Sequence, residues 1–413
     1  MSLIRPLRGL RPAPGRAPDV LAPPYDVVSS TEARRMADGH PWSFLHISKA
    51  EIDLPESQDP HSPEVYAKAA ENFDALLSAG VLTRDPEPAY YVYRLRMGDH
   101  EQTGVVVAAA VAAYRENRIR RHEFTRPDKE DDRVRQIEAL NAQTGPVLLA
   151  YPRAPEVDDL LQQVTLGAPE VDLEAADGVR HILWPMAEAG WCAQITRCFE
   201  AMRVLYIADG HHRSAAAERV ARTRAAADPG HCGQASYDAF LAVAFPAHRM
   251  RILDYNRVVK DLNGLAPDDF LARLSERFSV APAPDAVAPR RPGEFGLYLP
   301  GQWYRLTLPA ACIPPQDPVA RLDVSLLTDF LLTPVLGILD LRRDPRIDFV
   351  GGIRGLQELE RRVNSGGMAA AFALRPTPME ALMAVADAGE VMPPKSTWFE
   401  PKLADGLVSH VLD

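Results

Sequence analysis

The sequence predicts a mixed α/β fold, and three observations carry that prediction. The chain has 413 residues, of which 46% are hydrophobic and 25% charged, a balance typical of a globular protein. Apolar runs of strand length alternate with amphipathic stretches of helical period. The sequence also contains 25 glycines and 37 prolines, many of them between these stretches. A chain of this length is expected to form two or three domains.

The overall charge and the cysteines exclude several classes of protein. The formal net charge is −10 at pH 7, which argues against a nucleic-acid binder. No apolar run approaches the roughly 18 residues that span a bilayer, and the N-terminus lacks the apolar stretch of a secretory signal. The cysteines form no C-x-x-C pair, which favours reduced thiols and a cytoplasmic protein. A homodimer is compatible with these features. The four cysteines are Cys192, Cys198, Cys232 and Cys312.

The first region, residues 1–114, is expected to be α/β. Ser29 or Ser30 can cap a helix that runs toward Ala37, and residues 43–48 form a candidate strand. Residues 62–82 show helical spacing and end near Gly80. Residues 89–114 are typical of two strands joined by a turn at Gly98 and Asp99.

The second region, residues 115–260, is expected to hold the chemistry. It begins with a short strand and a charged loop, after which Asp131 or Asp132 can cap a helix that ends at Leu140. Gly145 and Pro146 then break the chain. The expected strands and one expected helix follow: strands at 147–151, 182–184, 204–208, 240–246 and within 251–264, and a helix near 193–202.

The third region, residues 261–413, alternates predicted helices and strands with proline-rich joints. Residues 347–363 are typical of a strand, a Gly-Gly turn and a helix. That turn could approach an anion, but it lacks the full G-x-G-x-x-G pattern and the P-loop lysine. A plain tight turn explains it as well.

The run LYIADGHHRSAAAERVA, residues 205–221, is the strongest functional signal. It predicts a buried strand, a sharp turn at Asp209 and Gly210, and a helix that opens on His211, His212 and Arg213. The first turn of a helix presents backbone N–H groups and the positive end of the helix dipole. Imidazoles and a guanidinium at that position favour a phosphate site. Asp209 could hold a magnesium ion or orient an imidazole.

Phosphoryl transfer also needs a group that takes the proton of the attacking hydroxyl. Glu123, next to His122, is our candidate for that base; the alternative is a surface partner for a nearby arginine. The charged run 128–133 could be a solvated helix start. Alternatively, Lys129 or Arg133 contacts a nucleotide and Arg126 reaches a phosphate.

Other constellations are less specific. Lys395, Ser396 and Thr397 follow a Pro-Pro turn and could line a substrate pocket, although capping and packing explain them equally well. Tyr25 in PPYDV could stack on a base or fill a core edge. The cysteines and histidines match no familiar zinc spacing, and no G-x-S-x-G elbow indicates a hydrolase.

Two resemblances add to these observations. The middle region resembles the nucleotide-binding core of the ParB and sulfiredoxin-like fold in the order of its elements. That order is a strand with His-Glu, a loop, a helix, Gly-Pro, a strand, and then a strand, the DGHHR turn and a helix. DGHHR is most similar to the free serine kinases of that superfamily, and Glu123 matches their catalytic Glu. The whole chain also resembles a widespread bacterial domain-of-unknown-function family through APPYDV, HEFTRPDKEDDR, ADGHHR, YNRVVKDLNGL, DFVGGIRGLQELE and MPPKSTWFEPKL. An insertion at 151–198 and the terminal regions depart from the kinases.

Together these features imply a phosphate-binding core with N- and C-terminal α/β additions. The function expected is a small-molecule kinase that uses ATP or ADP with Mg²⁺ to phosphorylate a hydroxyl metabolite, free L-serine first. In that function Glu123 and Asp209 are catalytic, Asp209 also holds the metal, and His122 joins Lys395, Ser396 and Thr397 at the substrate. The nucleotide and phosphate ligands expected are Gly210, His211, His212, Arg213, Arg126, Lys129 and Arg133. The alternative is a nucleotide-responsive binding protein without phosphotransfer. A sulfiredoxin-type enzyme would require a cysteine in the anion-binding turn, where this chain has histidine in DGHHR.

Overall fold

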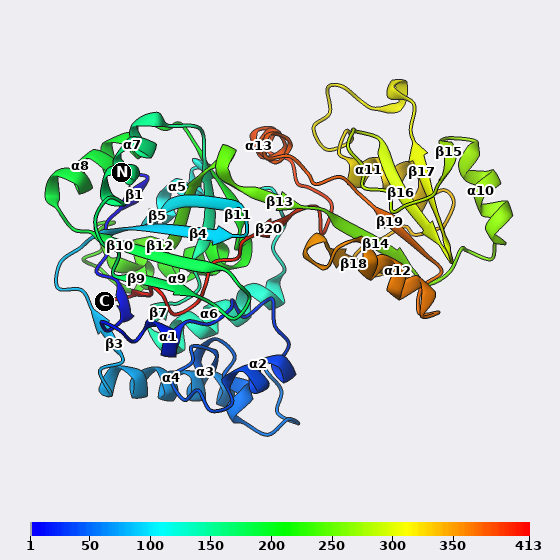
Figure 1. Cartoon of the computed structure of the whole chain (residues 1–413). Helices are drawn as coiled ribbons and strands as arrows, with labels where there is room; N and C mark the ends of the chain where they lie inside the picture. Colours follow the sequence, from blue (N-terminus) through cyan, green and yellow to red (C-terminus); the bar gives the residue numbers. More distant parts are fainter. Residues whose placement is uncertain (1) are drawn as a thin grey trace. The chain divides into compact units, whose positions relative to one another are not determined.

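The computed structural model describes residues 2–413, which divide into two compact units. The first unit comprises residues 2–250 together with 401–413, and the second comprises Arg251–Glu400 (Figure 1). Both contain helices and strands, so the predicted mixed α/β class is confirmed. The sequence suggested three regions instead. The difference arises because residues 90–110 supply the centre of the same sheet that carries the phosphate-site strands.

A nine-stranded mixed sheet forms the core of the first unit. Its order is β6-β11-β8-β12-β5-β4-β10-β9, and β1 also pairs with β5. β11 runs parallel to β6 and β12 parallel to β8, whereas the other pairs are antiparallel. The insertion predicted at 151–198 contributes β9 and β10, which extend one end of the sheet. The strands of this sheet are β1 Ile4–Arg5, β4 Tyr90–Met97, β5 His100–Ala110, β6 Ile119–Arg120, β8 Val147–Tyr151, β9 Val171–Glu174, β10 Arg180–Met186, β11 Leu205–Asp209 and β12 Ala239–Pro246.

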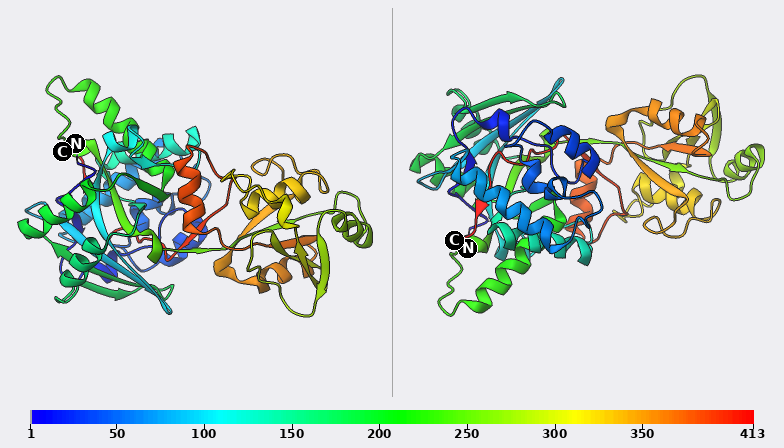
Figure 2. Two further views of the ribbon diagram at one scale, coloured as in Figure 1. Left: turned by 90° about the horizontal axis from the view of Figure 1, so that it is seen from above. Right: turned by 90° about the horizontal axis from the view of Figure 1, so that it is seen from below.

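Nine α-helices accompany this sheet among the described residues of the first unit. The N-terminal helices lie together on one side (Figure 1, blue), and α6 packs against both α4 and α9. The end of α9 and the loop after it project from the unit (Figure 2). The helices are α1 Ala17–Val20, α2 Ser30–Ala37, α3 Leu45–Ser48, α4 Pro63–Ser78, α5 Val111–Arg115, α6 Pro127–Leu140, α7 Pro155–Val164, α8 Ala189–Glu200 and α9 His211–Ala227.

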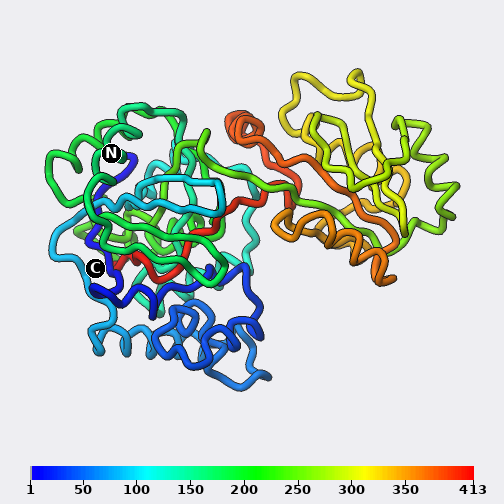
Figure 3. The backbone as a smooth tube through the Cα atoms, in the orientation of Figure 1, coloured from blue at the N-terminus to red at the C-terminus, as the bar shows by residue number. Residues whose placement is uncertain are grey.

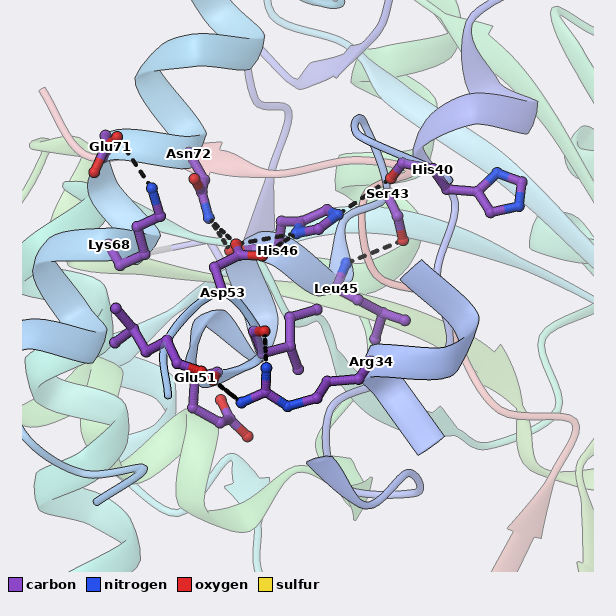
Figure 4. A network of polar contacts seen from close by, with 12 residues as sticks. Arg34, His40, Ser43, Leu45, His46, Glu51, Asp53, Lys68, Glu71 and Asn72 are labelled. Atoms are coloured by element: carbon purple, nitrogen blue, oxygen red, sulfur yellow. Dashed lines mark hydrogen bonds and ion pairs between the residues drawn. The ribbon is translucent and has the colours of Figure 1, made fainter. Parts of the chain in front are cut away.

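A polar network joins the N-terminal helices (Figure 4). Nδ1 of His46 lies 2.8 Å from Oδ1 of Asp53, and the Asn72 amide donates to the same carboxylate at 2.7 Å. Arg34 on α2 donates to the backbone oxygen of Glu51 at 2.9 Å. These contacts hold residues 45–53 as helical turns. The strand expected at 43–48 is therefore wrong, because its apolar residues pack as the short helix α3.

The C-terminal segment returns to the first unit, as the red end of the tube in Figure 3 shows. Asp405 forms a β-bridge with Ala22. The strand β21, His410–Val411, pairs with β7, Ala142–Gln143. The remaining two strands of this unit, β2 Leu10–Pro12 and β3 Leu82–Arg84, pair with each other. The return brings residues near the end of the chain beside the strand that follows α6.

The second unit contains a six-stranded antiparallel sheet in the order β15-β17-β16-β19-β14-β18. A separate antiparallel pair joins β13, Arg251–Leu253, to β20, Trp398–Glu400. The predicted strand, Gly-Gly turn and helix at 347–363 are confirmed as β18 and α12. The remaining elements are β14 Tyr255–Val259, β15 Ser279–Ala283, β16 Glu294–Leu299, β17 Gln302–Thr307, β18 Ile347–Gly351, β19 Ala370–Ala373, α10 Pro267–Ser275, α11 Asp323–Leu327, α12 Leu356–Asn364 and α13 Met379–Asp387.

Most predicted helix starts agree with the structure, with one correction. Ser29 caps α2 through a capping box with Glu32, as one of the two alternatives proposed. The helix expected to begin at Asp131 or Asp132 begins instead at Pro127. Proline suits the first helical position because its missing N–H is not needed there.

Within residues 2–413, no helix has the length and apolar character required to cross a bilayer.

Candidate functional site

The DGHHR motif forms a turn between the buried strand β11 and the helix α9. Gly210 has φ +94°, a left-handed conformation that glycine adopts without a steric penalty. The first helical hydrogen bond runs from the Ser214 N–H to the Gly210 oxygen at 3.0 Å. The helix itself therefore supplies no acceptor for the N–H groups of His211, His212 and Arg213. Their backbone presents the donor end of a 17-residue helix.

Asp209 ends β11 beside two cations. Its Oδ2 atom lies 3.4 Å from Nζ of Lys402 and 3.8 Å from a guanidinium nitrogen of Arg213. Its Oδ1 atom accepts the Gly210 N–H at 2.8 Å. Burial alone would raise the pKa of Asp209, but the charges of Lys402 and Arg213 outweigh burial and lower it. Asp209 is thus ionised, and two cations stand at the start of α9.

The buried His211 packs edge-on against His122, with ring centroids 4.5 Å apart. Burial lowers the pKa of His122 to about 4, and burial together with His122 lowers the pKa of His211. Both imidazoles are therefore neutral near pH 7. Nδ1 of His122 and Nε2 of His211 are buried without a hydrogen-bond partner among the described residues. A ligand that reached them would satisfy two polar atoms that the fold leaves unpaired.

Glu123 lies on the loop between β6 and α6, close to this pair. Its Oε2 atom is 3.8 Å from Nδ1 of His211, and its side chain is 46% exposed. The structure therefore brings Glu123, His122 and the turn together, as the sequence suggested. The carboxylate is accessible to a ligand that occupies the start of α9.

The loop after Glu123 is tied to the turn by His212. The Arg126 N–H donates to Nε2 of His212 at 3.1 Å, and Arg126 pairs with Asp128 at 2.7 Å. Burial lowers the pKa of His212, which suits an acceptor nitrogen. His212 thus positions the loop, and the exposed Arg126 side chain is oriented by its acidic neighbour. Lys129 lies in the exposed first turn of α6.

Arg133 points into the unit instead of toward solvent. It pairs with Asp132 at 2.6 Å, and its guanidinium carbon lies 4.0 Å from the ring centre of Tyr25. Tyr25 therefore packs against an arginine. This corresponds to the alternative in which Tyr25 of the PPYDV motif fills the edge of the core. Arg133, Tyr25 and Arg213 line one cavity of about 30 Å³, and Asp405 from the C-terminal segment completes it.

Lys395, Ser396 and Thr397 lie in the second unit. The buried Ser396 hydroxyl donates to the Pro393 oxygen at 2.7 Å, and its backbone oxygen accepts from Thr377 at 2.8 Å. Lys395 adopts φ +58° and places Nζ 5.7 Å from the Tyr255 ring centre. Capping and packing thus account for the contacts of Lys395 and Ser396 within their own unit.

Lys402 and Asp405 were not among the residues predicted from the sequence. Both lie in the EPKLADG stretch, which begins three residues after Thr397. Their local pattern is an ordinary polar loop, and only the return of the chain to Ala22 brings them to the turn. The only feature of the sequence that could have indicated Lys402 and Asp405 is that each is a charged residue beside an apolar segment near the C-terminus.

The described residues contain no group of three or more His, Cys, Asp or Glu side chains that could hold a metal ion. A single carboxylate such as Asp209 can still contact Mg²⁺ when a nucleotide supplies phosphate oxygens.

The sequence pattern of the family described as protein of unknown function (DUF1015) matches residues 4–325. The chain belongs to the DUF1015 family. The resemblance to a domain-of-unknown-function family is thereby confirmed, and the match includes the DGHHR turn, His122 and Glu123. No curated protein matches the chain.

Several solved structures resemble this DUF1015 member weakly. A free serine kinase in complex with AMP is 15% identical, with 74% of this chain and 92% of that chain covered and a TM-score of 0.35. SbnI from Staphylococcus aureus, with a C-terminal truncation, is 11% identical over 73% and 86%, with a TM-score of 0.37. A conserved hypothetical protein from Pyrococcus furiosus is 14% identical over 74% and 94%, with a TM-score of 0.35.

Proposed function

We propose that this protein transfers a phosphoryl group from ATP or ADP to the hydroxyl of a small metabolite, free L-serine first. The observation that carries the proposal is the position of Glu123, 3.8 Å from His211 at the start of α9. A carboxylate that can take a proton therefore stands beside an array of donors suited to phosphate.

In the proposed reaction, the turn holds the phosphates of the donor. The N–H groups of His211, His212 and Arg213 and the Lys402 ammonium face negative charge that grows on the transferred group. Arg213, two residues after His211 in the first turn of α9, adds a guanidinium. The buried His211 contributes a neutral imidazole. These groups neutralise charge without themselves changing protonation.

Glu123 acts as the general base. The acceptor oxygen forms a bond to the terminal phosphorus while its proton moves to a Glu123 oxygen, and the bond from phosphorus to the departing nucleotide oxygen breaks. The products are a phosphate ester and a nucleotide shortened by one phosphate. Glu123 releases its proton to solvent, which its 46% exposure permits.

Magnesium would reach this site with the nucleotide. Asp209 is the carboxylate closest to the turn, and one carboxylate plus phosphate oxygens is a common magnesium set. Lys402 already contacts Oδ2 of Asp209, so the metal would share that carboxylate or displace the ammonium. When bound, the ion would withdraw electron density from the phosphates.

The second candidate is a nucleotide-responsive binding protein without phosphotransfer. Burial of His122 and His211 as neutral groups favours it, since a ligand contact alone would satisfy their unpaired nitrogens. Incubation of the pure protein with ATP or ADP, Mg²⁺ and a panel of hydroxyl metabolites separates the two. A phosphorylated metabolite detected by mass spectrometry supports the kinase, and nucleotide binding without any product supports the binder.

A further inference from the structure

Arg213, the guanidinium assigned to phosphate above, has two carboxylates in its surroundings. Its side chain is 11% exposed, and one guanidinium nitrogen lies 3.8 Å from Oδ2 of Asp209. Nη1 donates to the Pro146 oxygen. The second carboxylate is that of Asp405, which lines the same small cavity as Arg213. The C-terminal segment therefore supplies an acidic group to the surroundings of the phosphate-site arginine.

Arg213 and Asp405 meet around one point beside Gly145. A methyl group at Gly145 would lie 3.7 Å from Nη1 of Arg213 and 3.6 Å from Oδ1 of Asp405. The cavity between these groups has a volume of about 30 Å³, which has room for roughly two water molecules. When Asp405 is ionised, its charge attracts the guanidinium strongly, because so little water screens the two groups.

The Asp405 carboxyl group is buried and incompletely paired. Asp405 is only 2% exposed, and its backbone is fixed by paired hydrogen bonds with Ala22 at 2.9 and 3.2 Å. Oδ1 has no hydrogen-bond partner among residues 2–413. A buried ionised carboxylate normally has such partners. A carboxyl group that lacks them is neutralised by protonation more easily than an exposed one.

The charged and titratable groups that face Asp405 come from three segments. Arg213 belongs to α9 and Arg133 to α6, while Asp26 and the buried Tyr25 lie in the segment between α1 and α2. Burial raises the pKa of Asp405 to about 7; the two arginines and the Tyr25 N–H oppose that rise, and Asp26 adds to it. Among the described residues, the others that line the cavity carry no titratable group.

We propose that Asp405 is a positioning residue of the phosphate site and acts through Arg213 according to its own protonation state. The ionised carboxylate draws the guanidinium toward the cavity and compensates part of its charge. The protonated form leaves Arg213 to a phosphate at the start of α9. Asp209 cannot act in this way, since Lys402 and Arg213 outweigh its burial and lower its pKa. The inference rests on the nucleotide binding of the proposed function but not on phosphoryl transfer.

The pH dependence of ADP binding tests this role, because a bound anion favours the protonated acid and protonation favours the anion in return. Calorimetry of the full-length protein compares the wild type with Asp405→Asn between about pH 6 and pH 8.5. Asparagine keeps the shape of the side chain and stays neutral. Over this range the wild-type affinity should fall by roughly five- to tenfold relative to the variant, the effect of one added negative charge near a partly buried site. ADP and the histidines of the turn titrate in both proteins, so the readout is the difference between the two curves.

Two further variants serve as controls. Asp26→Asn removes a second carboxylate near Arg213 but keeps Asp405, so the pH dependence should persist and move to lower pH. Asp74→Asn, at an exposed position on α4, should follow the wild-type curve. Circular dichroism establishes that each variant is folded, and Asp405→Ala replaces Asp405→Asn if the latter unfolds.

Asp405 can also be followed without any ligand. Carbon-13 NMR of protein labelled at the aspartate side-chain carboxyl should show one signal, absent in Asp405→Asn, that titrates near pH 7. Saturation with ADP should move that titration to higher pH. Titration of this signal at the ordinary value of about 3.9 would overturn the inference.

The outcomes separate this inference from the proposed function. Matching pH curves for the wild type and Asp405→Asn, with ADP bound by both, would overturn the inference alone. A pH dependence that disappears in Asp405→Asn, in a protein that transfers no phosphate to any acceptor, would support the inference and contradict the kinase. No binding of ADP by the wild type at any pH would overturn both.

Discussion

Nζ of Lys402 lies 3.4 Å from Oδ2 of Asp209, although 193 residues separate the two in sequence. The contact joins the C-terminal segment to the strand that precedes the phosphate turn. It places a second cation beside Arg213 at the start of α9. The C-terminal segment is therefore part of the candidate site and does not merely close the fold.

Replacement of Lys402 by Met should weaken nucleotide binding by roughly ten- to a hundredfold, which corresponds to the usual 1.5–3 kcal/mol of a hydrogen bond to a charged group. Lys402→Arg should retain most of the affinity because it keeps the charge. Fluorescence titration with a labelled nucleotide measures both. Lys68→Met, which removes the 3.0 Å pair with Glu71 on α4, is the control and should bind normally. Equal affinity in Lys402→Met and the control would remove Lys402 from the site.

Arg213→Ala should weaken nucleotide binding by about 1.5–3 kcal/mol, because a guanidinium contributes charge-assisted hydrogen bonds. His211→Ala and His212→Ala should weaken it less, since both rings are neutral and His212 is occupied by the Arg126 N–H. Isothermal titration calorimetry provides the values. Arg222→Ala on the same helix, with a side chain 68% exposed, serves as reference. A normal affinity in Arg213→Ala would contradict the phosphate assignment.

Gly210→Ala should destabilise the turn and impair nucleotide binding together. Alanine at φ +94° is strained, at a cost of about 1–2 kcal/mol, and its methyl group would lie 3.0 Å from Nε of Arg213. Gly80→Ala separates the two effects: φ there is +66° and nothing lies within 4 Å of the added methyl group. Thermal unfolding should register both substitutions, whereas only Gly210→Ala should reduce affinity. Matching affinities in the two variants would show that the turn does not orient Arg213.

Acid should destabilise the protein through buried histidines. Burial lowers the pKa of His181 to about 4 from its ordinary 6.5, and its Nδ1 accepts from the Tyr93 hydroxyl at 2.6 Å. The unfolded chain binds the proton first. The stabilising contribution is therefore complete above pH 6.5 and is lost as pH falls toward 4, by at most about 1.4 kcal/mol per unit.

His181→Gln keeps an acceptor for Tyr93 and removes the titration. Its unfolding temperature should fall less than that of the wild type between pH 6.5 and 4, as measured by differential scanning calorimetry. His40→Gln, at an exposed position, should follow the wild-type curve. Parallel curves for wild type and His181→Gln would mean that this imidazole titrates normally.

Local sequence patterns were sufficient to predict an element where a turn-forming residue such as glycine fixes the local backbone conformation. The hairpin of β4 and β5 follows from the turn at Gly98 and Asp99, and the register pairs Met97 with His100. The DGHHR turn could be predicted from Gly210, because glycine adopts the positive φ found there without a steric penalty. The presence of both elements was therefore readable before any tertiary contact was known.

The remaining features depend on contacts between distant segments. Residues 45–48 are a short apolar run that fits a strand or a helix equally well, and the helical state is held by Asp53 and Asn72. Asp405 gains its place from a bridge to Ala22. From the sequence, Arg133 was expected either to belong to a solvated helix start or to contact a nucleotide, yet it pairs with Asp132 and packs against the Tyr25 ring. No pattern within a single segment encodes these partners.

The most direct test of the central claim is the turnover of Glu123→Gln, with ATP or ADP, Mg²⁺ and the acceptor found for the wild type. Glutamine keeps the shape of the side chain but cannot take the proton. Turnover should fall by roughly 10²–10⁴-fold, the usual contribution of a general base, while nucleotide affinity stays within about twofold of wild type, a free-energy difference under about 0.5 kcal/mol. Wild-type phosphotransfer by Glu123→Gln, or no phosphotransfer by the wild-type protein itself, would contradict the account.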